Sequence, residues 1–186
     1  MRSMNRMRMA GVLTSVALAM GGCQETKLGP GSDLPELQAD RVMIDMEHFA
    51  SQNSIRRARL HADTALLFDD SASIQLRGMQ VSVFDAAGAS SGTVTANGGS
   101  INTRTDAMVA RGNVVLTTVG EGRTITTEEL HYDPQSGRMW SDVQTRIRNA
   151  DGTEQVAQSM TATIVDGRFT SFNAQNASGT TRGVTF

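Results

Sequence analysis

The sequence predicts an all-β fold, a curled sheet or roll built from repeated β-hairpins. A block of about twenty residues recurs from Ala62, Ala96 and Thr127, and a shortened copy starts at Ser159. The starts therefore lie 34, 31 and 32 residues apart, and self-similarity at such a period indicates an array of similar units. Within each copy, apolar and polar residues alternate on both sides of a turn. This period of two is typical of strands rather than helices.

Residues 1–22 are expected to be an export signal and not part of the fold. Three arginines precede an apolar run from Met9 to Met20, which is too short to span a membrane as a helix. Cys23, the single cysteine of the chain, follows Gly21 and Gly22 directly. This placement resembles a bacterial lipobox, which implies that the Cys23 thiol carries a diacylglycerol and becomes the mature N-terminus. The alternative is an ordinary signal peptide followed by a chance cysteine.

Residues 23–39 are expected to be a tether, because they combine proline, glycine and mixed charge. The folded domain then covers 40–186. In its first stretch Val42, Ile44 and Met46 alternate with polar residues, which predicts two strands joined by a loop at Ser51–Ser54.

Turn residues divide the remainder into short strands, ten to twelve in total, with no helix. The expected turns lie at 69–71, 85–88, 103–106, 120–122, 133–137, 149–152 and 166–167. Gly78 and Gly112 fall in mid-strand at equivalent positions of their copies, which predicts strands kinked at one level and a sheet that curls over. The third and fourth copies have Asp142-Val143 and Phe172-Asn173 at this position. The C-terminal end of the roll is therefore expected to be less regular and more open.

Ten alternating apolar residues are expected on the inner side of the roll. They are Ile74, Leu76, Val81, Val83, Ile101, Met108, Val114, Leu116, Ile125 and Tyr132. Alternation alone favours a closed core over a ligand groove. Trp140 is likewise expected to pack in the core rather than to stack on a ligand.

Composition and motifs indicate a protein without enzymatic activity, cofactor or metal. The net charge is −2 and no basic face stands out, which argues against nucleic acid. The three histidines, at 48, 61 and 131, lack metal-ligand spacing. The acid pairs Asp69-Asp70 and Glu128-Glu129 suit turns and solvated faces, and no known catalytic motif occurs. Arg56, Arg57 and Arg59 are expected on a solvated strand face, with contact to lipid phosphates as the alternative.

One run of residues resembles the LptC family, the periplasmic component of the lipopolysaccharide export machine. It starts as ARGNVV from Ala110, continues as TEELHYDP from Thr127 and ends as WSD from Trp140, with Gly137 between the last two. The resemblance extends over about residues 40–165 and includes the sister proteins LptA and the N-terminal domain of LptD. It implies a twisted, open β-jellyroll of the OstA-like type, whose apolar groove shields lipopolysaccharide acyl chains. The family has a transmembrane helix where this chain has the lipobox.

The resemblance also implies a place in a bridge between membranes. The edge near Val42–Met46 would face transporter subunits of the LptF/LptG kind, and the edge near Thr161–Phe172 would face an LptA-like jellyroll. The ten apolar residues would then line the lipid groove. A lipid-anchored protein of this kind would lie at the periplasmic face of the inner membrane, with the outer membrane as the alternative. The other interpretation is a structural envelope lipoprotein whose filled roll acts as a scaffold.

Overall fold

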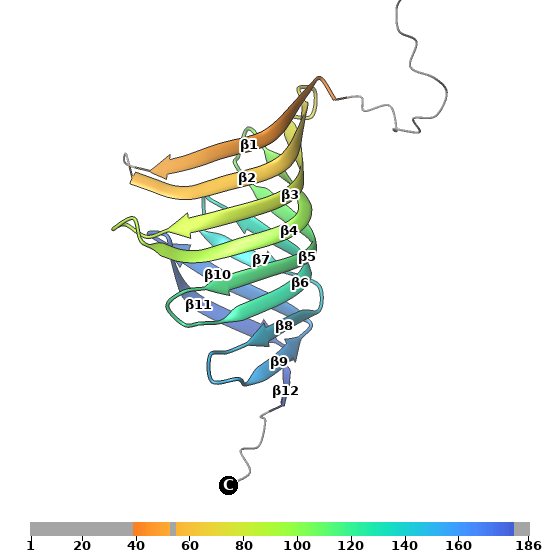
Figure 1. Cartoon of the computed structure of the whole chain (residues 1–186). Helices are drawn as coiled ribbons and strands as arrows, with labels where there is room; N and C mark the ends of the chain where they lie inside the picture. Colours follow the sequence, from red (N-terminus) through yellow and green to blue (C-terminus); the bar gives the residue numbers. More distant parts are fainter. Residues whose placement is uncertain (1–38, 53–54, 181–186) are drawn as a thin grey trace, which may run out of the picture. The chain divides into compact units, whose positions relative to one another are not determined.

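The described chain folds into one antiparallel sheet of twelve strands (Figure 1). The computed structural model describes residues 39–52 and 55–180, and these contain no helix. The strands are β1 (Arg41–Gln52), β2 (Ile55–Phe68), β3 (Ser73–Phe84), β4 (Ser90–Asn102), β5 (Met108–Thr118), β6 (Thr124–Asp133), β7 (Arg138–Ser141), β8 (Thr145–Arg148), β9 (Glu154–Ala157), β10 (Ser159–Val165), β11 (Arg168–Gln175) and β12 (Ser178–Thr180). The predicted all-β class is confirmed. Of the loop expected at 51–54, Ser51 and Gln52 belong to β1 instead, and residues 53 and 54 lie outside the described residues.

The long strands are kinked along a common line, as the recurring glycines predicted. Asp45 of β1, Gly78 of β3, and Gly112 and Asn113 of β5 have left-handed backbones, with φ of 55°, 60°, 75° and 48°. Asp45 and Gly78 both lie across from Asp63 of β2, where the pairing on each side skips one residue. At Gly112 and Asn113 the register of β5 with both β4 and β6 shifts by one residue, a β-bulge that increases the local twist and bends the strand. Since the kinks are aligned across neighbouring strands, the whole sheet curls.

Beyond β6 the sheet forks into two branches. The chain leaves the strand conformation at 142–144, so that β7 and β8 are separate. The first half of β6 pairs with β8 and the second half pairs with β7. One branch continues as β7–β10–β11 and the other as β8–β9–β12. The third copy has no glycine at the kink position, and its strand breaks there instead of bending.

The inward side chains of both halves form a single apolar core. Across the sheet, Ile74, Ile101, Met108, Tyr132 and Met139 face one another in register from β3 to β7. Residues in register on neighbouring strands share a face, so this row crosses the roll. Full burial of such a side chain, as at Ile101 and Met139, contributes about 1.5–3 kcal/mol.

Trp140 is not in this core, contrary to the sequence prediction. Met139 is paired with Tyr132 and faces inward, so the next residue of β7 must face outward. There the Trp140 ring stacks on His131 of β6, with ring centroids 5.0 Å apart. The outer face therefore carries the only tryptophan of the chain.

The turn between β10 and β11 fastens the C-terminal hairpin to the ends of β2, β3 and β4. Arg57 Nη1 donates to the Asp166 carbonyl at 3.1 Å, and Arg168 Nη2 donates to Asp85 Oδ2 at 2.9 Å. Ser91 Oγ donates to the Gly167 carbonyl. Arg57 is thus a tertiary contact with a side chain only 16% exposed, which corrects the prediction of a solvated strand face.

Candidate functional site

The structure brings all ten predicted groove residues together on the inner face of the sheet. Seven of them are at most 9% exposed: Leu76, Val81, Val83, Ile101, Val114, Leu116 and Ile125. Ile74, Met108 and Tyr132 are half-buried and pack against the same cluster. The predicted residues therefore form one continuous apolar face, but the space inside the roll is mostly filled by the side chains of that face. Contact of these residues with lipid stays a prediction.

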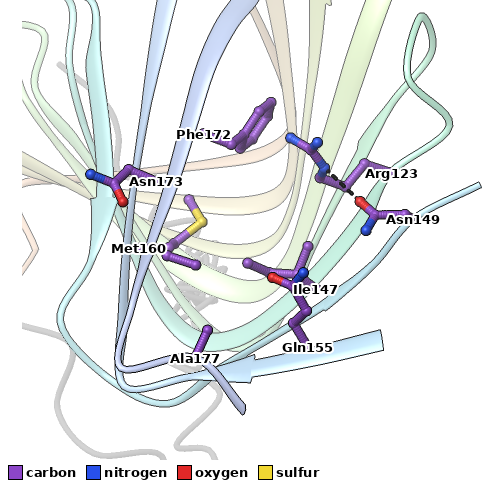
Figure 2. A pocket seen from close by; sticks show the side chains of 9 residues that line it. Arg123, Ile147, Asn149, Gln155, Met160, Phe172, Asn173 and Ala177 are labelled. Carbon is purple, nitrogen blue, oxygen red and sulfur yellow. Dashed lines mark hydrogen bonds between the residues drawn. The ribbon is translucent and has the colours of Figure 1, made fainter. Parts of the chain in front are cut away.

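An opening into this interior lies at the fork, between the two branches (Figure 2). It is a cavity of about 240 Å³. The lining residues come from β8, β9, β10 and β11 and from the segments beside them: Arg123, Ile147, Asn149, Gln155, Met160, Phe172, Asn173, Ala174 and Ala177. None of the ten predicted residues is among them. The nearest link is Ile125, which is in register with Ile147 and lies in the core beside it.

Sequence reasoning missed this cavity because its walls meet only through the fork. Phe172 reaches it from β11, and its ring stacks on Phe169 with centroids 5.9 Å apart. Both rings pack on the apolar core. The cavity wall and the inner face of the roll are thus one apolar surface.

Arg123, which directly precedes β6, joins the two branches at the cavity. Its guanidinium carbon lies 4.2 Å from the centroid of the Phe172 ring, and its Nε donates to Asn149 Oδ1 at 3.1 Å. Nη1 lies 2.9 Å from Glu121 Oε2. The side chain is 21% exposed, and a cation over an aromatic face is worth about 0.5–2 kcal/mol, more as it is desolvated.

Three buried hydroxyl groups hold the branch point itself. Thr127 of β6, Ser141 of β7 and Thr145 of β8 are at most 4% exposed. Thr127 Oγ1 and Ser141 Oγ are 2.9 Å apart, and Thr145 Oγ1 donates to the Val143 carbonyl at 2.9 Å. This cluster satisfies the polar groups exposed where the strand breaks.

Tyr132 and Glu129, two titratable groups of β6, have shifted pKa values. Burial raises the pKa of the Tyr132 phenol and the neighbouring Asp133 carboxylate adds to the rise, so this hydroxyl stays neutral. Hydrogen bonds from Arg111 and His131 hold the pKa of Glu129, on the outer face, below its ordinary value. Residues 39–52 and 55–180 contain no group of three or more His, Cys, Asp or Glu side chains placed to hold a metal ion.

Three strands of the described sheet have a free edge. β1 pairs only with β2, β11 only with β10, and the three-residue β12 only with β9. On β1 the outward-facing Val42 and Ile44 are 51% and 71% exposed, an unusual apolar pair for a solvated edge. The predicted signal segment, Cys23 and tether lie outside the described residues, and within the described part no helix is long and apolar enough to cross a membrane.

Comparisons with known proteins agree with this architecture. Residues 10–172 match the family model described as lipopolysaccharide-assembly, LptC-related. The crystal structure of LptH, the LptA-homologous periplasmic component of the lipopolysaccharide transport device of Pseudomonas aeruginosa, is similar with a TM-score of 0.51 and 14% sequence identity. That similarity covers 68% of this chain and 95% of LptH, and it confirms the predicted jellyroll fold. Comparison with curated proteins gives no match.

Proposed function

The chain belongs to the LptC-related family of lipopolysaccharide-assembly proteins, and from this premise we propose that it is a lipid-anchored component of a periplasmic lipopolysaccharide transport bridge. Its roll would shield the acyl chains and pass the lipid from an inner-membrane ABC transporter to an LptA-like protein. The observation that carries this proposal is the apolar inner face that runs across the sheet and ends in a cavity at the fork.

The fork is the proposed entrance for acyl chains. Its apolar wall of Ile147, Met160 and Phe172 continues into the core, and each methylene buried there contributes about 0.8 kcal/mol. The cavity of about 240 Å³ is smaller than the roughly 300–1,000 Å³ of usual ligand sites. A full acyl chain must therefore part the two branches and displace core side chains. Unbranched methionines at 108, 139 and 160 suit such repacking.

The free edges are the proposed contacts with the neighbouring bridge proteins. An unpaired strand can add a strand from a partner through main-chain hydrogen bonds. We assign β1, with its exposed Val42 and Ile44, to transporter subunits of the LptF/LptG kind. We assign β11 to an LptA-like jellyroll. In this proposal residues 1–22 are removed, lipidated Cys23 holds the tether 23–39 to the periplasmic face of the inner membrane, and 40–186 is the jellyroll domain. The outer membrane is the alternative location.

Site-specific photo-crosslinking in living cells tests the groove. A benzoylphenylalanine at Phe172 or Met108, both half-buried on the inner face, should capture lipopolysaccharide. The same probe at Ser171 or Gln75, exposed neighbours on the outer face, should not. Equal capture at inner and outer positions would refute the groove.

The filled interior favours a second candidate, a structural envelope lipoprotein whose roll serves as a scaffold. Seven of the ten predicted groove residues are already buried by their neighbours, as a permanent core requires. This candidate predicts no lipid adduct at Phe172 or Met108, while probes on the edge strands β1 and β11 still capture proteins.

A further inference from the structure

We infer that the cavity at the fork selects amphiphiles with an anionic phosphate headgroup, which Arg123 binds while the attached chain lies on the apolar wall. The inference rests on the proposed lipid-carrying function and adds a chemical preference to it. It is carried by the charge, hydrogen bonding and polarity of the residues that line the cavity.

Arg123 is the single formal charge on the cavity wall, since no Asp or Glu is among the lining residues. The nearest carboxylate, that of Glu121, lies in the preceding turn and is 51% exposed, so water screens it. The guanidinium itself is four-fifths buried against the Phe172 ring. A cation in such a position gives the cavity a positive potential, and its planar group is suited to phosphate oxygens.

One donor of this guanidinium is left without a hydrogen bond. Arg123 Nε is used by Asn149, but Nη1 is buried and has no hydrogen-bond partner within the described residues. Nη1 lies 2.9 Å from Glu121 Oε2, an ion pair with a carboxylate that is 51% exposed. An ion pair with an exposed partner is worth about 0–1 kcal/mol, so an anionic oxygen that enters the cavity can compete for this donor.

The lining of the cavity has a polar side and an apolar side, which suit the headgroup and the chain of an amphiphile. Figure 2 shows Arg123 and Asn149 together on one side, with Met160 across the cavity and Phe172 beside the guanidinium. Gln155 of β9 also lines the cavity, and within the described part of the chain its side-chain amide makes no hydrogen bond, so it remains available to a headgroup. Ala174 and Ala177 complete the apolar wall.

The test uses the full chain in phosphatidylcholine vesicles that contain one of two photoreactive probes at equal mole fraction. The probes are a diazirine-labelled lysophosphatidic acid and a monoacylglycerol with the same labelled chain. Adducts on peptides of the fork are quantified by mass spectrometry. A hydrogen bond to a charged group is worth about 1.5–3 kcal/mol, so the wild-type chain should capture the anionic probe roughly tenfold or more over the neutral one.

Three variants locate the preference. Arg123→Gln should lower the capture ratio to about one, and Arg123→Lys should retain a preference because it keeps the charge. Arg148→Gln is the matched control, since Arg148 is 65% exposed on the neighbouring β8 and pairs with Glu154 instead. The unfolding midpoint of each variant shows that the fork is intact.

The outcomes separate this inference from the proposed function. Equal capture of both probes by the wild type, or an unchanged ratio in the folded Arg123→Gln variant, would overturn the headgroup preference alone. Capture of neither probe would overturn the lipid-carrying function, and the preference with it.

Discussion

Replacing Thr145 with valine should destabilise the fork without changing its shape. The hydroxyl of Thr145 is fully buried, donates to the Val143 carbonyl at 2.9 Å and lies 3.2 Å from Ser141 Oγ. Valine has nearly the same volume but cannot donate. The Val143 carbonyl would keep only the longer 3.3 Å contact from Ser141 Oγ. A lost hydrogen bond with a partly unsatisfied buried acceptor costs about 1–3 kcal/mol.

The assay is equilibrium unfolding in urea, followed by circular dichroism of the β-sheet, together with a thermal scan. For a domain of this size, each kcal/mol lowers the Tm by roughly 2–4 °C. Thr126→Val is the matched control because Thr126 is an exposed residue of the adjacent β6, and we expect it to change the unfolding free energy by less than about 0.5 kcal/mol. A Thr145→Val protein as stable as the wild type would refute the argument that these hydroxyls hold the branch point.

Two further predictions concern the turn that fastens the C-terminal hairpin. Gly167→Ala and Gly152→Ala both place alanine on a left-handed backbone, with φ of 76° and 82°, at a cost of about 1–2 kcal/mol. A Cβ at Gly167 would lie 1.9 Å from the Phe84 carbonyl oxygen, whereas one at Gly152 meets open space. In urea unfolding, Gly167→Ala should therefore lose roughly 1–3 kcal/mol more unfolding free energy than Gly152→Ala does. Equal losses in the two variants would contradict the close approach of Gly167 to Phe84. Separately, a hydrogen bond from Arg168, supported by two backbone amides, holds the pKa of Asp85 below its ordinary value. A depressed folded-state pKa stabilises the fold above about pH 4 and loses this contribution as the pH falls through that pKa. Asp85→Asn should thus reduce the loss of unfolding free energy between about pH 6 and about pH 3, and an unaltered pH dependence would argue against this ion pair.

Local signals accounted for most of the strands and their kinks. Two turns are found where expected, at 133–137 and at 166–167. Their proline and glycine residues favour a turn because of the φ angles that these residues themselves prefer. Gly78 and Gly112 predicted the level of the kink because few other residues tolerate a left-handed backbone in mid-strand. Asp45 and Asn113 share that backbone and were missed, since Asp and Asn adopt a left-handed backbone in only a minority of their occurrences.

The face that a side chain occupies was predictable only where the alternation is unbroken. The ten apolar residues all face the core, because a consistent period of two along a long strand fixes which face each side chain occupies. Trp140 belongs to a strand of four residues, too short to carry such a pattern. A shift of one residue in pairing reverses the face, and only the register with β6 decided it.

The sequence by itself determined the all-β class, the repeated hairpins, the kink line and the identity of the inward apolar set. Each of these features is predicted by short-range patterns, namely the turn residues and the alternation of apolar and polar residues within a few positions of one another. The tertiary structure alone decided that the third copy breaks into a fork, that Arg123 meets Phe172 across it, and that three buried hydroxyls from separate strands hold it together. Those contacts join residues of different strands, and they depend on which strand β6 pairs with along each half of its length. No local pattern encodes that choice, because it is settled by the burial and hydrogen bonding of the whole sheet.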